Sequence, residues 1–417
     1  MPPTGFVYMV AAARKAGFDC VIHDAWLKNH PLEQAAREVC SNVMDGDIVG
    51  VQMFQDTVGW VRKFVRGIKQ WSRAKVVVGG PYVTALGDAA RAEVGADVGV
   101  RYEADSDIGF MIDQIIHSTI PRTFDMSFAD VNKIPIPEWD SVRLPEYWPY
   151  LYQVSTPTMG KRIGVVQRSR GCVFRCTYCA SRATTGHRVR IRDDDNVLEE
   201  VNYLRKHWGM DELWFADDNT IADYTRGVEL FEKLAPLGLH IRLPLGVRWE
   251  NVDNTMAHTM ERAGVYFTGI GIESGNPRML KRIKKSLDQD RTRGAIEILD
   301  KHNITTIGFF IFGLPTETRE EMEDTVRWAL NTRLHHAQFG VFIPYPGAED
   351  YYERSLLPQA ELVKIQRNAT LRFYFRLRIV RSFIRRFQWS QIRAIWGHPW
   401  VKAWRSTPKL WARKERA

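Results

Sequence analysis

Short apolar runs alternate with amphipathic stretches at the start of the chain. The runs at residues 47–52 and 75–80 have the length and composition of buried parallel strands, and the stretch between them has helical spacing. Gly79 and Gly80 close the second run, where the backbone must turn or approach a ligand. This rhythm predicts a βαβ sheet domain over residues 1–120. Ligands of such open sheets bind at the carboxyl ends of the strands.

The same alternation returns in residues 161–350. In chain order it predicts a strand at 164–168, a helix at 196–207, a strand at 212–216, a helix at 225–235, strands at 241–246 and 269–273, a helix at 291–302 and a strand at 306–312. Repeated βα units predict a parallel barrel or part of one, with active-site residues at the C-terminal strand ends. Functional side chains do follow three of these strands: a group of cysteines, the pair Asp217 and Asp218, and Glu273.

Residues 121–160, between these regions, are rich in Pro, Trp and Tyr. Proline at this density argues against a regular helix or a central strand. We therefore predict an irregular linker whose aromatic side chains pack between domains. Tyr147, Trp148 and Tyr150 have a second interpretation as residues that line a substrate cleft.

Positive charge is concentrated at the C-terminal end. Residues 361–417 contain 15 Lys and Arg against two Glu, a net charge of +13, so that residues 1–360 carry −4 of the chain's +9. Within the predicted tail, residues 351–417, arginines interleave with large apolar residues as in an amphipathic helix. Two interpretations stay open: a helical cover of the barrel, or a helix that lies on an anionic membrane surface. Nucleic-acid binding is not expected, because no recognition module is present.

The composition indicates a globular protein of two or three domains, since the chain has 417 residues and 45% hydrophobic content. We expect it in the cytoplasm, because no apolar run reaches about 18 residues and the N-terminus does not resemble a signal peptide. Five cysteines, three of them clustered, do not make a disulfide framework, and Cys20 and Cys40 are interpreted as ordinary thiols. His23, beside Asp24 on a predicted strand, is interpreted as a packing residue rather than a metal ligand.

The clustered thiols are Cys172, Cys176 and Cys179, within eight residues. Thiolates this close repel one another unless a cation compensates them, and soft sulfur ligands favour zinc or an iron–sulfur cluster. A structural zinc needs a fourth ligand, which His187 could supply.

The spacing Cys-x3-Cys-x2-Cys, with the aromatic Tyr178 before the last cysteine, resembles the radical S-adenosylmethionine (radical SAM) enzymes. The resemblance implies that the three thiolates hold a [4Fe-4S] cluster whose fourth iron binds SAM. It also implies an electron donor such as flavodoxin or ferredoxin.

Further cofactor contacts follow from the same resemblance. The pair Asp217 and Asp218 resembles an acidic pair of this family and is expected near the SAM ammonium group. Glu273, with Ser274 in the same motif, resembles the acid that contacts the SAM ribose. Ile311 and the ring of Tyr178 are expected to contact the adenine.

The order of segments in residues 1–120 resembles the cobalamin-binding domain that precedes the radical SAM domain in one subgroup, with its first strand missing. We expect cobalamin near Gln52, Gly79 and Gly80. The motif Asp-x-His-x-x-Gly is absent, so no protein histidine is expected beneath the cobalt.

The resemblance predicts a cobalamin-dependent radical SAM enzyme that methylates an unactivated carbon of a small or lipid-like substrate. Its fold is expected to be α/β: a Rossmann-like cobalamin-binding domain, a partial (β/α)6 TIM-type barrel and a basic helical tail. One alternative is a radical SAM oxidative cyclase like the anaerobic magnesium-protoporphyrin ester cyclase. A non-enzymatic alternative is a zinc- or RNA-binding protein that uses the thiols for zinc and the tail for phosphate.

Overall fold

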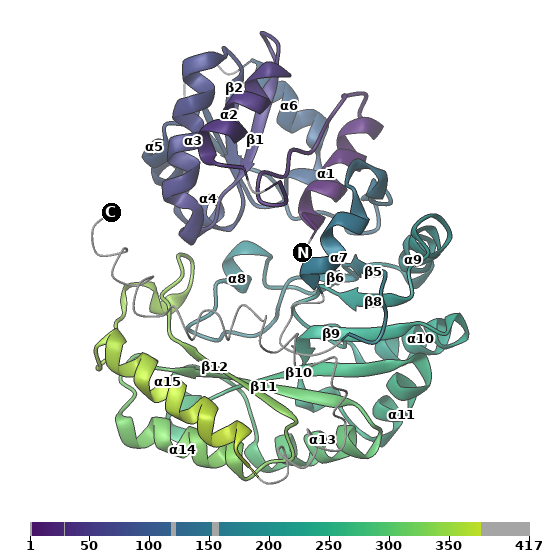
Figure 1. Cartoon of the computed structure of the whole chain (residues 1–417), viewed down its shortest axis with the longest axis vertical. Coiled ribbons are helices and arrows are strands. Elements are labelled where there is room, and N and C mark those ends of the chain that lie inside the picture. The colour runs from purple at the N-terminus through teal and green to yellow at the C-terminus, as the bar shows by residue number, and fades with distance from the viewer. Residues whose placement is uncertain (1, 29, 118–121, 152–157, 377–417) are drawn as a thin grey trace.

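The computed structural model describes residues 2–28, 30–117, 122–151 and 158–376 (Figure 1). The N-terminal part is a parallel four-stranded sheet in the order β1-β2-β3-β4. In chain order its elements are α1 (Thr4–Lys15), α2 (Leu32–Ser41), β1 (Ile48–Gln52), α3 (Val58–Trp71), β2 (Lys75–Gly79), α4 (Pro81–Leu86), α5 (Asp88–Val94), β3 (Val98–Arg101), α6 (Ile108–Ile116) and β4 (Arg122–Asp125). The predicted strands at residues 47–52 and 75–80 are therefore β1 and β2.

Helices cover both faces of this sheet, which explains why β2 is a continuous valine run. Val76 and Val78 pack with apolar residues of α2, α3 and α5, whereas Val77 packs with those of α1 and α6. Successive side chains of a strand point to opposite faces, so a strand buried on both faces needs apolar residues at every position.

The prediction of a strand at residues 21–25 is wrong. This segment, which contains His23 and Asp24, is an irregular loop between α1 and α2, and β1 forms the edge of the described sheet. A strand persists only where a neighbour pairs with its backbone groups. The apolar residues of this loop contact the other domain instead: Ile22 and Leu27 pack against the large core of the second domain.

The second domain is a six-stranded parallel sheet in the order β12-β11-β10-β9-β8-β5, curved with its helices outside (Figure 1). Its elements are β5 (Ile163–Val166), β6 (Ser169–Arg170), α8 (Ser181–Thr184), β7 (Arg190–Ile191), α9 (Asp194–Trp208), β8 (Glu212–Phe215), α10 (Tyr224–Leu234), β9 (His240–Val247), α11 (Asn254–Ala263), β10 (Val265–Glu273), α12 (Pro277–Arg282), α13 (Gln289–Lys301), β11 (Thr305–Phe312), α14 (Arg319–Leu330), β12 (His336–Val341) and α15 (Gln359–Tyr374). The predicted partial (β/α)6 barrel is confirmed.

Capping residues set the starts of the barrel helices. Asp223, Asp253 and Asp288 each accept backbone N–H groups at the first turns of α10, α11 and α13. Thr318 and Glu321 form a reciprocal capping box at the start of α14. Each cap satisfies N–H groups that have no partner inside the helix, which fixes where the chain turns from loop to helix.

The linker contains a helix that its proline content argued against. α7 (Leu144–Leu151) has Pro145 in its first turn and Pro149 in its interior. Pro145 costs little there, because the first N–H groups of a helix lack internal partners anyway. Leu144, Tyr147 and Leu151 are buried, so tertiary packing outweighs the bond lost at Pro149.

The aromatic side chains of α7 pack against neighbouring segments. The Tyr147 hydroxyl donates to Asp24 at 2.6 Å, and Trp148 Nε1 donates to the Ile163 carbonyl at 3.1 Å. These contacts favour the packing interpretation over the cleft interpretation for both residues.

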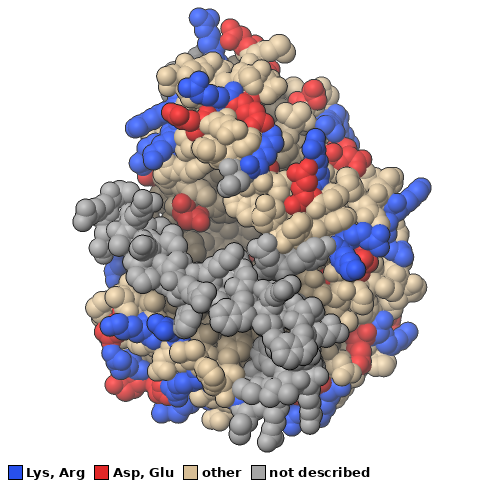
Figure 2. All heavy atoms as spheres, in the orientation of Figure 1, with Lys and Arg blue, Asp and Glu red and all other residues tan. Residues whose placement is uncertain are grey.

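Arginines of the barrel bind acids of the N-terminal domain. Arg190 donates two hydrogen bonds to Glu103, at 2.6 and 2.7 Å, and Arg170 donates two to Asp105, at 3.0 and 2.7 Å. All four side chains are at most 18% exposed. Figure 2 shows the surface hollowed between the two domains. The bidentate pairs fix how the N-terminal domain sits on the barrel.

α15 packs against β12 and accounts for part of the predicted tail. Residues 377–417, which hold most of the basic and aromatic residues of that tail, lie outside the described residues. Across the residues that the structure describes, we find no helix with the length and apolarity needed to span a bilayer.

Candidate active site

The cysteine loop follows β5 and is closed by a short hairpin. β6 and β7 pair antiparallel. Gly171, directly after β6, has a φ of +96°, and a Cβ atom there would lie 2.1 Å from the carbonyl oxygen of Arg188. Only glycine fits this closure. The N–H of Cys172 donates to the carbonyl of Gly186 at 3.1 Å, which fixes the first cysteine at the base of the loop.

The far part of the loop is fastened to the barrel through Thr177. Its N–H donates to the Ile283 carbonyl at 3.1 Å, and its hydroxyl donates to the buried carboxylate of Asp350 at 2.5 Å. Arg282 binds the other oxygen of Asp350 at 2.9 Å. Because Thr177 directly follows Cys176, these bonds also fix the second cysteine.

The three cysteines are half-buried and free. Burial is the main cause that raises the pKa of Cys172, and the neighbouring thiols Cys176 and Cys179 add to it. Burial likewise raises the pKa of Cys176. Thiolates in such a group require a compensating metal, so the site has the chemistry of a metal centre.

The three sulfur atoms do not all lie within 4.8 Å of one another in this structure. With Zn–S bonds of about 2.3 Å, the sulfur atoms of a tetrahedral zinc site lie roughly 3.8 Å apart. Within the described ranges, three His, Cys, Asp or Glu ligand atoms lie within 4.8 Å of one another at two places, and neither includes a cysteine. His187, the fourth ligand of the zinc alternative, is exposed. Cysteine thiolates are the usual ligands of iron–sulfur clusters, the other metal centre that this group of thiols suits.

Glu273, at the end of β10, adopts an unusual backbone conformation beside the thiols. Its φ is +68°, and the pairing register of β10 with β11 shifts between Gly271 and Glu273. A bulge of this kind redirects the side chain. The carboxylate accepts a hydrogen bond from Lys285 Nζ at 3.1 Å, and both side chains are 9% exposed. A Cβ atom on Gly271 would lie 2.6 Å from Glu273 Oε1, so a larger residue there would displace the pair.

Sequence reasoning missed two cations at this site. Lys285 and Arg248 both lower the pKa of Cys176, against the dominant effect of burial. Arg248 also stacks on the ring of Phe174 inside the cysteine loop, 3.4 Å from its centroid. Lys285 lies in a run of basic residues in which nothing in the sequence marks one lysine as buried.

Tyr178 and Ile311 lie against the same apolar group, and their contact with adenine stays a prediction. Both pack against the buried apolar group Met279, Ile283, Leu314 and Phe342. Burial, followed by the charge of Glu273, raises the pKa of Tyr178 well above its ordinary value. Tyr178 is thus a neutral phenol between Glu273 and an apolar surface.

The acidic pair after β8 divides into two different environments. Asp217 is fully buried and accepts hydrogen bonds from the N–H and hydroxyl of Ser169, which fixes the start of the cysteine loop. Burial raises its pKa to about 6, and its second oxygen has no hydrogen-bond partner among the described residues. Asp218 accepts a bond from the Thr185 hydroxyl at 3.2 Å. Contact of either residue with SAM stays a prediction.

Ser274 is fully buried, and its hydroxyl lies 3.1 Å from that of Thr325 on α14. It also accepts the N–H of Asn276 at 3.1 Å. These bonds hold the turn after Glu273, and the predicted contact of Ser274 with cofactor is untested.

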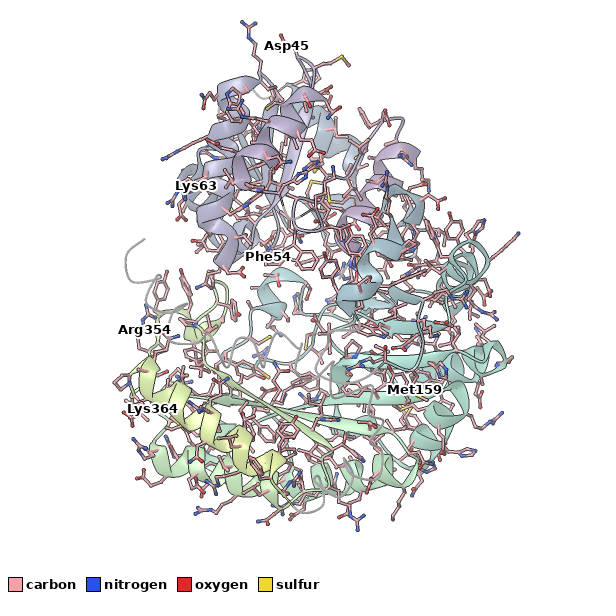
Figure 3. The ribbon with its side chains drawn as sticks, viewed as in Figure 1. Asp45, Phe54, Lys63, Met159, Arg354 and Lys364 are labelled. Atoms are coloured by element: carbon pink, nitrogen blue, oxygen red, sulfur yellow. The ribbon has the colours of Figure 1, made fainter. Side chains whose placement is uncertain are left out.

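The strand ends of the N-terminal domain face the barrel. Asp45, before β1, lies at the far end of the molecule, whereas Phe54, after β1, lies on the side toward the barrel (Figure 3). Gly80 has a φ of +95°, and a Cβ atom there would lie 3.0 Å from Gln52 and 3.2 Å from the backbone of Met53. Gln52, Gly79 and Gly80 thus form a close-packed turn without bulky side chains, which fits approach by a large planar cofactor.

The strand ends of the N-terminal domain and the cysteine loop of the barrel meet through α4 and α8. α4 begins directly after Gly80, α8 begins two residues after Cys179, and the two helices pack together. A Cβ atom on Gly347 would lie 3.3 Å from Ala85 of α4 and 3.1 Å from Ala183 of α8. Small residues therefore let the two strand-end regions approach each other closely.

Two family models match this chain. Residues 166–329 match the radical SAM superfamily, and residues 1–108 match the B12 binding domain. An uncharacterized methyltransferase of Pyrococcus horikoshii is 28% identical over 83% of this chain and 77% of its own length. The cytidylyl-2-hydroxyethylphosphonate methyltransferase of Streptomyces wedmorensis is 32% identical over 53% of this chain, which spans only 43% of that relative.

A similar fold is found in a solved structure. The radical S-adenosylmethionine methyltransferase TsrM from Kitasatospora setae, with cobalamin and a [4Fe-4S] cluster bound, superposes with a TM-score of 0.67 at 16% identity, over 84% of this chain and 71% of that one. The two matched domains, their order and this fold agree with the thiol loop and the glycine turn described above. The chain therefore carries a B12-binding domain followed by a radical SAM domain, and the cofactors of these two kinds of domain are cobalamin and a [4Fe-4S] cluster with SAM.

Proposed function

We propose that this enzyme is a cobalamin-dependent methyltransferase that acts on an unactivated carbon of a small or lipid-like molecule. The observation that carries the proposal is the direct packing of α4 on α8. It joins the glycine turn of the B12-binding domain to the cysteine loop, so that both cofactors would address the same space between the domains.

Each group of residues has a distinct task in this proposal. Cys172, Cys176 and Cys179 hold the cluster, Glu273 binds the SAM ribose, and the apolar surface at Tyr178 and Ile311 keeps water from the adenine. When bound, the cluster with SAM supplies a 5′-deoxyadenosyl radical, and cobalamin supplies a methyl group for the resulting carbon radical.

The N-terminal domain would bind cobalamin without a histidine ligand. Gln52, Gly79 and Gly80 allow the backbone at the strand ends to lie against the cofactor face. No Asp-x-His-x-x-Gly motif occurs in the sequence. Electron paramagnetic resonance of the cobalamin-loaded protein tests this, since histidine-nitrogen splitting of the cobalt signal would contradict it.

Three further points belong to the proposal. The cluster would be reduced by a small donor such as flavodoxin or ferredoxin, and the enzyme would work in the cytoplasm. The basic end of the chain would touch anionic membrane when the substrate is lipid-like, since its net charge is +13 over residues 361–417. Sedimentation with anionic liposomes at low salt, and release as salt rises, tests the last point.

Methyl transfer is tested with methyl-deuterated SAM and an extract of the source cells. The anaerobically reconstituted enzyme should add a deuterated methyl group to one organic compound, seen by mass spectrometry. Cys176→Ser protein treated in the same way is the control and should add none. A product that loses hydrogen and gains no label would instead support the oxidative cyclase.

A further inference from the structure

Two histidines and a glutamate converge in the N-terminal domain, away from the thiols. His23 and His30 lie in the loop between α1 and α2, and Glu38 lies on α2. One ligand atom from each residue lies within 4.8 Å of the other two. His30 Nδ1 is 2.9 Å and His23 Nδ1 is 3.9 Å from the Glu38 carboxylate, and the two imidazole rings are 6.1 Å apart. Two imidazoles and one carboxylate are a ligand set that zinc accepts in proteins.

The fold by itself leaves His23 only partly satisfied. His23 Nε2 is buried and has no hydrogen-bond partner among the described residues. A buried polar group without a hydrogen-bond partner lowers the stability of the fold. An ion bound by the imidazoles would remove this loss of stability.

The loop that carries the histidines is held in place from outside. Asp24 accepts hydrogen bonds from the Leu27 N–H at 2.9 Å and from the Tyr147 hydroxyl at 2.6 Å. Trp26 packs on Tyr150, with ring centroids 4.9 Å apart. These contacts tie the loop to α7, so the imidazoles are positioned before any ion binds.

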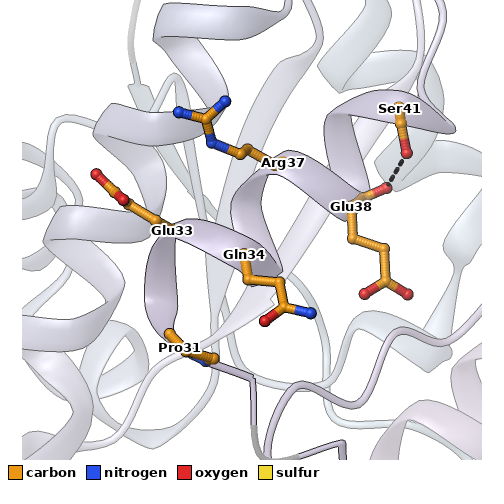
Figure 4. A pocket seen from close by; sticks show the side chains of 6 residues that line it. All are labelled: Pro31, Glu33, Gln34, Arg37, Glu38 and Ser41. Atoms are coloured by element: carbon orange, nitrogen blue, oxygen red, sulfur yellow. Dashed lines mark hydrogen bonds between the residues drawn. The ribbon is translucent and has the colours of Figure 1, made fainter.

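The Glu38 side chain is 31% exposed and lines an open groove on α2. The side chain points away from the guanidinium of Arg37 on the same helix (Figure 4). This shallow groove is lined by Pro31, Glu33, Gln34, Arg37, Glu38 and Ser41. Lys28 is hydrogen-bonded to the Glu38 carboxylate, and its side chain is 43% exposed. The Lys28 ammonium group thus lies at the carboxylate that a metal ion would bind, and it can move out into water when an ion binds.

We propose that His23, His30 and Glu38 form a zinc site, with solvent as the fourth ligand and Lys28 as the competing cation. The ion fastens the loop to α2 and, through Asp24 and Tyr147, supports the contact between the N-terminal domain and α7.

The test is zinc titration of the protein by anaerobic calorimetry. The protein carries its cluster and no histidine tag, so that neither the three thiols nor a tag competes for zinc. Wild-type protein is expected to bind one zinc ion per chain. His23→Ala and Glu38→Gln should each weaken this binding by at least about 100-fold. Lys28→Gln should tighten zinc binding several-fold, because the ammonium group no longer competes for the Glu38 carboxylate. The Lys28 side chain is exposed, so this change should not harm the core.

The second group of converging ligand atoms, His258, Glu261 and His302, provides the matched control. Unlike His23, neither histidine of this group has a buried ring nitrogen without a partner among the described residues, and both Glu261 oxygens accept bonds, from His302 at 2.8 Å and Asn303 at 3.0 Å. His302→Ala should therefore leave zinc binding unchanged. Absence of zinc binding by the wild type, binding that survives His23→Ala, or loss of binding in His302→Ala would each overturn the proposal. A zinc-dependent rise in melting temperature, present in wild type and absent in His23→Ala, separates lost binding from lost folding.

Discussion

Two opposite charges lie buried beside one of the thiols, and their pairing determines what the site can bind. Glu273 is held at a positive φ, and Lys285 Nζ donates to its carboxylate at 3.1 Å. Removal of one partner from a buried pair leaves the other charge uncompensated. Lys285 therefore both orients Glu273 and offsets negative charge at Cys176.

We expect Lys285→Met to weaken SAM binding by roughly 10- to 100-fold, because Glu273 loses the group that orients it. Equilibrium binding of SAM to the cluster-loaded protein measures this. Lys284→Met is the matched control, since Lys284 is 51% exposed and pairs with Glu349 at the surface. Equal effects of the two changes would contradict the assigned role of Lys285.

Gly171→Ala should lower the iron content of the protein without unfolding it. The new Cβ atom would lie 2.1 Å from a backbone oxygen at a φ of +96°, so the hairpin that closes the cysteine loop must open. Iron and labile sulfide per chain after anaerobic reconstitution are expected to fall by at least about half. Gly59→Ala, where nothing lies within 4 Å, should retain full iron content.

Among single residues, the sequence predicted those whose residue type and spacing indicate a particular chemistry. The spacing of Cys172, Cys176 and Cys179 indicated a metal site, and Tyr178 and Ile311 do share one apolar surface. Lys285 was not predicted, because several basic residues lie side by side in this run. The turn after α12 decides which of them points into the site. That direction is set by tertiary contacts.

Helices and strands follow the periodicity of the sequence wherever an element has neighbours on both sides. The barrel strands and helices predicted from the sequence lie within a few residues of their predicted positions, whereas α11, α14 and β12 were not predicted. Residues 21–25 and α7 depart from the prediction for the same physical reason: pairing and burial, rather than local composition, decided their conformation. Elements between the domains are therefore the hardest to predict, since their partners are distant in sequence.

The ion pair between Arg190 and Glu103 should couple the two domains energetically. Both residues are at most 18% exposed and joined by two hydrogen bonds. A double-mutant cycle of Arg190→Met and Glu103→Gln is expected to give a coupling of about 1.5–3 kcal/mol. The exposed pair Arg143 and Glu146, 86% and 47% accessible, should give less than about 0.5 kcal/mol. Similar couplings in both cycles, from urea unfolding, would argue against a fixed domain arrangement.

For the molecule as a whole, stability should depend on pH through Glu317. This side chain is fully buried, accepts the N–H groups of Gly313 and Leu314, and has one oxygen without a described partner. Burial raises its pKa to about 8. The folded state thus holds the proton more tightly than the unfolded state, whose Glu pKa is about 4.3. The group's contribution to stability is present below that value and is lost as pH rises to about 8.

Glu317→Gln should therefore flatten the fall of stability between about pH 5 and pH 8, where this one group contributes at most about 1.4 kcal/mol per pH unit. Urea unfolding of the two proteins across this range measures the difference. Glu320→Gln, at an exposed position on α14, should show the same change of unfolding free energy with pH as the wild type. A wild-type slope that Glu317→Gln leaves unchanged would assign the pH dependence to other groups.

The proposed enzyme uses SAM both as a radical source and as a methyl donor. The most direct measurement counts 5′-deoxyadenosine and S-adenosylhomocysteine formed from SAM by the reduced, cluster- and cobalamin-loaded protein supplied with cell extract. We predict that both products accumulate together, and that both are lost in Cys176→Ser protein. Formation of 5′-deoxyadenosine without S-adenosylhomocysteine would contradict methyl transfer and support a cyclase, and formation of neither would contradict the assigned site.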